Sequence, residues 1–446
     1  MMYLPPYVRA CLERLENAGF ATYAVGGCVR DSLLGLTPHD FDLCTAATPE
    51  QIRQVFSDHR LVLAGEKHGT VTVVIDSQLV EITTFRLEGG YKDNRHPDWV
   101  KFVPTVEEDL SRRDFTVNAM AYSPSRGFAD PFGGQEDLKK KILRAVGEPN
   151  LRFTEDSLRI LRGLRFSVRY QLTPEAATWE AMRSLSPLME NLARERVFDE
   201  LCKLLPLVNA QELQTFAPIL SQVLPEIRPV INFRQNSKHH IYDLMEHTAR
   251  VVEGVPPQLH LRWAALLHDI GKPGTCVIDE AGEGHYHGHA KESAQMADAV
   301  LLRLKAPTAL RKQVTDLISR HMTPLEPDKH LLRRRLGKYG VQETLDLLEL
   351  QKADYFATGT KAVPGPFPEI SRLIDEILEE AACFSIRDLA INGNDLQALG
   401  FTPGPDLGEC LARLLRLVQE DAIPNEKAAL LQKARDFLSH PPAEKM

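Results

Sequence analysis

Several features that would place this chain in a specialised class are missing from its sequence. No apolar run approaches the roughly 18 residues that a membrane-spanning helix needs, and the N-terminus lacks the pattern of a signal peptide. The seven cysteines are scattered without a C-x-x-C pair, so neither a disulfide framework nor a zinc ribbon is indicated. We therefore expect a cytoplasmic protein without a membrane partner.

A basic overall charge is also missing. The net charge of −8 does not suggest a nucleic-acid-binding protein, although averages hide local fields. The stretch 139–169 is locally basic, with three acidic residues against Lys139, Lys140, Lys141, Arg144, Arg152, Arg159, Arg162, Arg165 and Arg169. Such an excess could contact phosphates, and a solvated helix face is the alternative.

The G-x-G-x-x-G fingerprint of dinucleotide-binding folds is absent, and a different glycine pattern stands near the N-terminus. Gly26 and Gly27 follow an apolar run at 23–25 and precede a helical pattern. Glycines there let backbone N–H groups approach a phosphate, and Arg30 adds positive charge. Alone, a Gly-Gly pair is usually only a turn.

Three carboxylates extend this pattern toward metal binding. Asp40 and Asp42 alternate on a predicted strand, so both point to one face while Phe41 points to the core. Glu81 lies in the middle of another predicted strand, where a charge needs a partner or an exposed edge. Together the glycines and carboxylates predict a site that holds a triphosphate against divalent metal.

The chain length of 446 residues allows two to four domains, and a hydrophobic content of 43% is ordinary for a globular protein. Residues 1–135 mix a helix after Pro5-Pro6 with strands at 21–25, 40–44, 69–75 and 79–85. From about residue 137 the pattern is almost wholly helical, with one apolar stripe made by Leu158, Leu161, Leu164 and Val168. The sequence predicts an α+β fold, with a small α/β head before a long helical body.

The glycine and aspartate motifs resemble those of the DNA polymerase beta-like nucleotidyltransferases, and more narrowly the bacterial class II tRNA nucleotidyltransferases and their poly(A) polymerase relatives. Further matching segments follow in the same order, at 90–97, 112–119, 130–134 and 152–159. The match is dense over about residues 20–200. It implies a polymerase-beta-like head with a small mixed sheet, then a helical neck, body and tail.

The resemblance also implies roles. Asp40 and Asp42 would bind two Mg²⁺ ions beside Glu81, and the tRNA 3′-hydroxyl would attack the α-phosphate of CTP or ATP. Gly27 and Arg30 would hold the triphosphate. Nucleotide binding would further involve Arg113, Asp114, Asp156, Arg159, Arg162 and Arg165, with Asp114 accepting from the ribose 2′-hydroxyl.

Asp156 and Arg159 are three residues apart, which predicts that they share a helix face. A carboxylate accepts from the amino groups of cytosine and adenine, while arginine donates to the adjacent ring acceptor. Uracil and guanine present an acceptor to the carboxylate and would be repelled. One pair can therefore admit CTP and ATP and reject UTP and GTP; a surface ion pair is the alternative.

The segment Gly89–Asp98 matches the flexible loop that the family needs to switch from adding C to adding A. Its presence favours full C-C-A addition or A addition alone. A poly(A) polymerase remains an alternative function, because the same motifs occur in tRNA nucleotidyltransferases and in poly(A) polymerases. So does a nucleotide phosphohydrolase whose head only binds nucleotide.

A second set of residues is distributed over 239–354: His247, His268, Asp269, His289, His321 and Asp354. The order, with an adjacent His-Asp pair, resembles the HD phosphohydrolase superfamily. Imidazole and carboxylate ligands suit a divalent metal of uncertain identity. His247, His268, Asp269 and Asp354 would form the core site, leaving His289 and His321 for a second ion or a phosphate. A degenerate domain kept as a tRNA platform is the alternative.

These patterns divide the chain into a nucleotidyltransferase head at 1–136, a helical neck at 137–210, an HD domain at 211–368 and a tRNA-binding tail at 369–446. The tail segment 389–408 resembles that of the family, and its Gly/Pro turn could hold the tRNA backbone or be structural. The sequence predicts no oligomeric state.

Overall fold

The computed structural model describes residues 2–89, 99–237, 241–359, 363–380, 386–420 and 422–439. The chain divides into two compact units. Unit 1 comprises Met1–Val208, Thr215–Arg228 and Arg303–Ala306, and unit 2 comprises Asn209–Gln214, Pro229–Leu302 and Pro307–Met446. No helix within the described ranges is long and apolar enough to cross a membrane.

Unit 1 contains a seven-stranded sheet. Its strands, in spatial order, are β3 (Arg60–Val62), β4 (Thr70–Ile75), β5 (Gln78–Thr84), β2 (Asp42–Thr45), β1 (Thr22–Val25), β8 (Ala121–Ser123) and β9 (Gly127–Ala129). β2 and β5 run parallel and the other neighbours are antiparallel, so the sheet is mixed as expected. The four strands expected from the sequence are present; β3, β8 and β9 were missed because each has only three residues.

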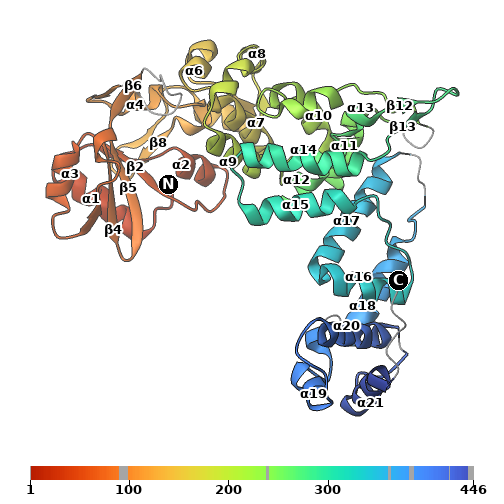
Figure 1. Ribbon diagram of the computed structural model, residues 1–446. Coiled ribbons are helices and arrows are strands. Elements are labelled where there is room, and N and C mark those ends of the chain that lie inside the picture. The colour runs from red at the N-terminus through yellow and green to blue at the C-terminus, as the bar shows by residue number, and fades with distance from the viewer. Residues whose placement is uncertain are drawn as a thin grey trace. The chain divides into compact units, whose positions relative to one another are not determined.

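Helices α1 (Pro6–Asn17) and α3 (Pro49–Val55) pack on this sheet, while α2 (Gly27–Leu33) follows β1 directly (Figure 1). The alternation expected along β5 is confirmed, because Val80, Ile82 and Thr84 are buried and Glu81 is exposed. The apolar stripe of α1 is buried as well. The period-two and period-3.6 patterns therefore place the sheet and its helices as the sequence predicts.

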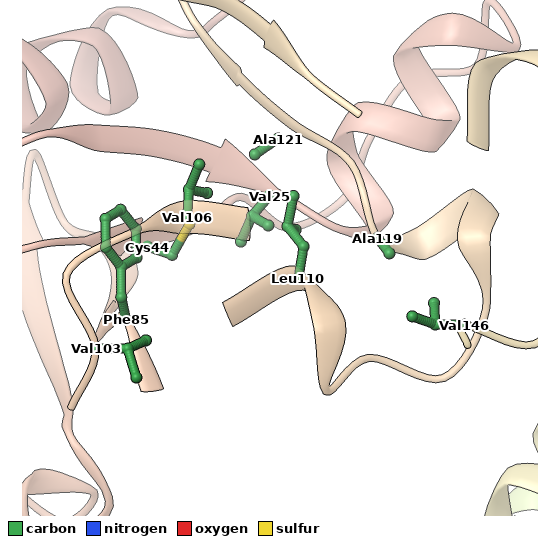
Figure 2. Packing of buried hydrophobic residues seen from close by; sticks show 9 residues of the cluster. All are labelled: Val25, Cys44, Phe85, Val103, Val106, Leu110, Ala119, Ala121 and Val146. Carbon is green, nitrogen blue, oxygen red and sulfur yellow. The ribbon is translucent and has the colours of Figure 1, made fainter. Parts of the chain in front are cut away.

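A buried cluster joins the sheet to α4 (Val106–Ser111). Val25 and Cys44 come from the sheet, while Val106 and Leu110 come from α4, and Phe85 and other apolar residues surround them (Figure 2). Leu110 is fully buried, and truncating such a residue to alanine costs about 2–5 kcal/mol. This packing fixes the start of residues 112–114 against the strand that carries Asp42.

The rest of unit 1 is largely helical. It contains the hairpin strands β6 (Arg86–Gly89) and β7 (Trp99–Phe102), the short pair β10 (Ile142–Leu143) and β11 (Thr173–Pro174), and helices α5 (Gly134–Lys139), α6 (Pro149–Glu155), α7 (Leu158–Tyr170), α8 (Ala176–Ser184) and α9 (Arg194–Leu204). The stripe predicted on α7 is buried. Residues 90–98, which include most of the predicted loop, lie outside the described residues.

Unit 2 is helical apart from the two-residue strands β12 (Val277–Ile278) and β13 (Gly284–His285). Its helices are α11 (Leu244–Gly254), α12 (Leu259–Leu267), α13 (Lys272–Thr275), α14 (His289–Arg303), α15 (Thr308–Arg320), α16 (Lys329–Tyr339), α17 (Val341–Ala357), α18 (Phe367–Glu379), α19 (Gly393–Ala398), α20 (Pro405–Gln419) and α21 (Lys427–Ser439), while α10 (Ala210–Leu220) spans the unit boundary. α11 packs on α12 and α17, and α12 packs on α15.

The last three helices form a small core of their own. Leu396 of α19, Leu414 of α20 and Leu430 of α21 are fully buried in it. Asn392 caps α19 through a capping box with Asp395. The segment 389–408 therefore has a structural role in the tail, whatever it binds.

Candidate functional site

A cavity of about 520 Å³ lies in unit 1 and is lined by polar residues. It gathers most of the residues singled out from the sequence: Gly27, Arg30, Asp40, Asp42, Arg113, Asp114, Asp156, Arg159, Arg162 and Arg165. Glu81 is not among its lining residues. The cavity therefore brings together residues that are far apart in the sequence, from Gly27 on α2 to Arg165 on α7.

The turn between β1 and α2 accepts only glycine at its first position. Gly26 has φ +77° and ψ −125°, a conformation that side chains strongly disfavour. A Cβ on Gly26 would lie 2.9 Å from Nη1 of Arg113, and one on Gly27 would lie 3.5 Å from Nη2 of Arg30. The glycines therefore allow two arginines to approach the backbone of this turn.

Asp42 opens β2 and lies opposite Glu81 in the parallel register, so the two side chains share a face of the sheet. Desolvation by the surrounding protein raises the pKa of Asp42, and Glu81 and Asp40 raise it further, while Arg113 opposes the shift. Glu81 and Asp40 thus both lie close enough to Asp42 to repel its charge. A bound cation would relieve this repulsion.

The prediction that Asp40 lies on the same strand as Asp42 is wrong. β2 begins at Asp42, and Asp40 precedes it in irregular backbone. The ladder stops there because its partner β1 ends at Val25, where Gly26 turns the chain away. Phe41 and Leu43 are nevertheless buried as expected.

Arg30 is buried and makes contacts along its whole guanidinium. Its Nε donates to Asp31 at 2.9 Å, Nη1 donates to Asn118, and Nη2 donates to the hydroxyl of Tyr170 at 2.5 Å. Its guanidinium carbon also lies 4.1 Å from the centre of the Tyr170 ring. Arg30 therefore connects α2 to the end of α7 and forms part of the cavity wall.

The 112–114 segment is held by buried ion pairs. Asp109 is fully buried and accepts from Arg112 Nη2 at 2.9 Å and from Arg113 Nη2 at 3.3 Å. Arg112 also pairs with Glu88 of β6 at 3.0 Å. Nε of Arg113 is buried and has no hydrogen-bond partner among the described residues. Arg113, which lines the cavity, therefore has one N–H group that is available to donate a hydrogen bond.

Asp114 is buried and hydrogen-bonds to three neighbouring residues. It accepts from the backbone N–H of Phe115, from Asn118 Nδ2 at 3.0 Å and from Arg162 Nε at 2.8 Å. Burial alone would raise the pKa of Asp114, but Arg162 and Asn118 hold it well below its usual range. The Asp114 carboxylate therefore stays ionised, and it holds the Arg162 guanidinium at the cavity by accepting its hydrogen bond.

Asp156 and Arg159 both line the cavity, but they do not share a helix face as predicted. Asp156 has extended backbone between α6 and α7, because its side chain accepts from the N–H of Leu158 and breaks the helix. Arg159 pairs with Glu155 at 2.7 Å, and Asp156 pairs with Arg196 at 2.9 Å. The surface ion pair between Asp156 and Arg159, which was the alternative to base selection, is therefore absent among the described residues.

Sequence reasoning missed Arg196 and Glu200, which lie on α9. Arg196 contacts Asp156, and Glu200 accepts from Arg165 Nε at 2.6 Å. The two residues are four apart and share a helix face, a spacing that was visible in the sequence. Part of the basic stretch is paired: Arg144, Arg152, Arg159, Arg162 and Arg165 each have a carboxylate partner. Lys139 and Lys141 are exposed and have no ion pair among the described residues.

A second cluster lies in unit 2, where helices α11, α12, α14, α15 and α17 contribute the six predicted residues. His247 is on α11, His268 and Asp269 follow α12, and His289 begins α14. His321 follows α15, and Asp354 lies on α17. Two triads have ligand atoms that all lie within 4.8 Å of one another: His247, His268 and Asp354, and Asp269, His289 and His321.

Asp269 lies between the two histidine pairs. Its Oδ2 is 3.5 Å from His247 Nε2 and 3.1 Å from His268 Nε2. Its Oδ1 is 3.3 Å from His289 Nε2 and 3.8 Å from His321 Nε2. One carboxylate therefore presents a separate oxygen to each pair, which is the arrangement of a bridging ligand.

The histidines are oriented by the backbone. Each Nδ1 lies within hydrogen-bond distance of a backbone carbonyl, 3.2 Å away for His247 and 2.7 Å for His268, His289 and His321. With Nδ1 donating, Nε2 keeps its lone pair and points into the cluster. Both oxygens of Asp269 are buried without a hydrogen bond, although Lys272 Nζ forms an ion pair with Oδ2 at 2.7 Å. These residues fit a divalent metal.

Protonation of the cluster follows from its buried charges. Burial would lower the pKa of His247, but Asp269 and Asp354 raise it to about 9. Burial and the neighbouring His268 lower the pKa of His321 to about 4. Metal binding would therefore have to displace a proton from His247 and none from His321.

A cavity of about 600 Å³ opens onto one side of this cluster. Asp269, His289, His321 and Asp354 lie at its polar end, with Lys272 beside them. Aromatic and apolar side chains line much of the remainder, beside His285, His287, Gln351 and Thr358: Tyr286, Met322, Pro324, Leu325, Tyr355, Pro366 and Phe367. The cavity combines ligands for a metal with a wall suited to an apolar or planar group.

Comparison with known proteins identifies relatives over nearly the whole chain. Residues 22–144 match the "Poly A polymerase head domain", 171–228 the "Probable RNA and SrmB- binding site of polymerase A" and 289–434 the tRNA nucleotidyltransferase domain 2. The CCA-adding enzyme of Latilactobacillus sakei is 35% identical over 97% of this chain and 99% of its own length. That of Leuconostoc mesenteroides is 33% identical over 96% and 95%.

Solved structures give the same result for the fold. The Bacillus stearothermophilus CCA-adding enzyme in complex with CTP is 27% identical, with a TM-score of 0.73 over 98% of both chains. A Thermotoga maritima CCA-adding enzyme complexed with tRNA is 20% identical, with a TM-score of 0.64 over 98% of this chain and 96% of that one. The latter likeness concerns the fold alone.

Proposed function

This chain belongs to the CCA-adding enzymes, and we propose that the cavity of unit 1 is its active site, at which CTP and ATP are joined to the 3′ end of tRNA as C-C-A. The observation that carries this assignment is the meeting, in one cavity, of Asp40 and Asp42 with Arg113 and the Asp156–Arg159 segment. The chain is accordingly an RNA nucleotidyltransferase that depends on a divalent metal.

Asp40 and Asp42 are the proposed ligands of two Mg²⁺ ions, with Glu81 supporting them from β5. The raised pKa of Asp42 beside Glu81 supports a cation site, because two like charges on one sheet face favour a bound cation. Bound metal would activate the attacking 3′-hydroxyl and stabilise charge on the leaving phosphate. The protein supplies the ligands and the rigid sheet that positions them.

The triphosphate is proposed to bind at the Gly26-Gly27 turn. Arg113 and Arg30 lie against this turn, and Arg113 Nε is a buried donor without a hydrogen-bond partner among the described residues. Arg30 lines the wall and adds positive charge. Asp114 holds Arg162, and Glu200 holds Arg165, so both arginines keep a fixed geometry toward the nucleotide. Asp114 is also the proposed acceptor of the ribose 2′-hydroxyl.

Base selection is proposed for Asp156 and Arg159. The carboxylate accepts from the amino group of cytosine or adenine, and the guanidinium donates to the neighbouring ring acceptor. Their current partners, Arg196 and Glu155, hold these two groups at the cavity before a base arrives. The segment Gly89–Asp98, of which residues 90–98 lie outside the described residues, is proposed to switch addition from C to A.

We assign the regions of the chain as follows: head 1–136, neck 137–210, HD domain 211–368 and tRNA-binding tail 369–446. The HD cluster is proposed to bind divalent metal through His247, His268, Asp269 and Asp354, with His289 and His321 serving a second ion. Its bridging Asp269 and the adjoining cavity support hydrolysis of a phosphoester, such as a 2′,3′-cyclic phosphate or a 2′-phosphate on a nucleotide. A platform without activity is the competing assignment.

Incubation with tRNA lacking C-C-A, Mg²⁺ and each nucleotide separately tests the main assignment. We expect transfer of CMP and AMP and no transfer of UMP or GMP. Long A tails on unrelated RNA would instead assign the chain to the poly(A) polymerases. For the HD cluster, Asp269→Ala should remove phosphodiesterase activity and spare nucleotide transfer. Failure of the wild-type chain to hydrolyse any phosphoester with Mg²⁺, Mn²⁺, Ni²⁺ or Co²⁺ would leave only the platform.

A further inference from the structure

Three cations of unit 2 surround a single tyrosine. Tyr339 is the last residue of α16, and its ring centre lies 4.2 Å from Arg320, 5.7 Å from Arg335 and 5.2 Å from Lys338. Arg335 Nη1 also donates to the Tyr339 hydroxyl at 3.0 Å. We call these four residues the Tyr339 cluster. None of them belongs to the HD centre or its cavity.

The Tyr339 cluster is short of negative charge. Within the part of the chain that the structure describes, no carboxylate comes within 4 Å of Arg335 or Lys338. Among the same described residues, Arg320 forms an ion pair only with Asp316, at 3.5 Å. Lys312 forms a closer ion pair with that carboxylate, at 2.6 Å. Three positive charges thus surround one aromatic ring, and the nearby carboxylate of Asp316 also pairs with Lys312.

At the opposite end of α16, two cations are neutralised by a carboxylate. Lys329 and Arg333 both reach Glu380, at 2.5 and 2.7 Å. The Tyr339 ring and the C-terminus of α16 offset some of the repulsion in the cluster. Neither carries a full negative charge. The uncompensated half of α16 is therefore a site for an external anion.

We propose that the Tyr339 cluster binds backbone phosphates of the tRNA, an inference that rests on the proposed function. Arginine and lysine side chains are the usual phosphate partners, and the tRNA is the polyanion on which the chain acts. Cations occupy the neighbourhood of the tyrosine ring, so the ring is not free to stack on a base. The contact is therefore with the backbone and independent of sequence.

The test compares tRNA binding by the wild-type chain and by the double variant Arg335→Gln/Lys338→Gln. Dissociation constants for a tRNA lacking C-C-A are measured over roughly 50–300 mM KCl. Each lost phosphate contact reduces the slope of log K against log salt by about one, so we expect a decrease of about two. KM for tRNA should rise about tenfold, with kcat and KM for CTP unchanged.

Two controls separate a specific contact from general charge. Arg372→Gln/Lys352→Gln removes the same charge from exposed residues of unit 2 that have carboxylate partners, and it should leave the slope as in the wild type. The single variant Arg335→Lys keeps the positive charge and should retain most of the affinity of the wild-type chain for tRNA. An unchanged slope in the double variant, or an equal loss in the control pair, would overturn the inference. Absence of nucleotide transfer by the wild-type chain would instead refute the proposed function.

Discussion

The carboxylate of Asp156 accepts a hydrogen bond from Nη2 of Arg196 at 2.9 Å, although the two residues are 40 positions apart in the chain. Asp156 lies in the break between α6 and α7, where its side chain also accepts from the N–H of Leu158. Arg196 is on α9, which packs against α7. The carboxylate that we propose selects the base therefore depends on a helix that sequence reasoning left out of the site.

Replacement of Arg196 tests this dependence. In Arg196→Gln, Asp156 loses its charged partner and its fixed orientation, so kcat/KM for CTP and ATP should fall about 10- to 100-fold. Discrimination against UTP should fall with it. Single-nucleotide transfer assays measure both. Arg183→Gln is the control, because Arg183 lies outside the cavity and pairs only loosely with Glu180 at 3.7 Å; an equal loss there would contradict the assignment.

The Gly26 turn gives a second prediction. Gly26→Ala would place a Cβ 2.9 Å from Arg113 Nη1 at a positive φ, so nucleotide binding should weaken at least about tenfold. Gly19→Ala has a similar positive φ and nothing within 4 Å of the added Cβ. It should lower the melting temperature comparably and leave KM for CTP unchanged. Equal KM values in the two variants would show that the turn does not position Arg113.

Asp114 links the site to pH-dependent stability. Its pKa is well below the ordinary value of an unfolded chain, so its stabilising contribution is present above about pH 4 and is lost as pH falls toward its folded pKa. Arg162→Gln should lower the free energy of unfolding by about 1–3 kcal/mol at pH 7 and by less at pH 3. Thermal melts at both pH values measure the difference. An equal loss at both would contradict the pairing.

Metal content tests the cluster in unit 2. We expect the wild-type chain, loaded with Mn²⁺ or Ni²⁺ and desalted, to retain up to two ions that Asp269→Ala does not retain. The bridging position of Asp269 between the two histidine pairs is the reason. Elemental analysis provides the measurement, with Asp279→Ala as the control on an exposed carboxylate that pairs with His285. Equal metal content in both variants would exclude the bridging role.

The sequence predicted the parts of this molecule that depend on local periodicity. The buried residues of β5, the stripe of α7 and the glycine turn all follow from side-chain alternation and backbone sterics. The partners of Asp156, Arg159 and Asp114 did not follow, because they depend on which helices pack together. The three-residue strands were missed since their pairing comes from tertiary contacts rather than from a local pattern.

The most direct measurement follows transfer of labelled CMP, AMP, UMP and GMP to a tRNA lacking C-C-A, by the wild-type chain and by Asp42→Asn. The account predicts that the wild type completes C-C-A from CTP and ATP, with UTP and GTP at background. It predicts loss of transfer in Asp42→Asn with an unchanged melting temperature, because that variant removes a proposed metal ligand and keeps the size of the side chain. Equal incorporation of UMP by the wild type, or near-normal transfer by Asp42→Asn, would contradict it.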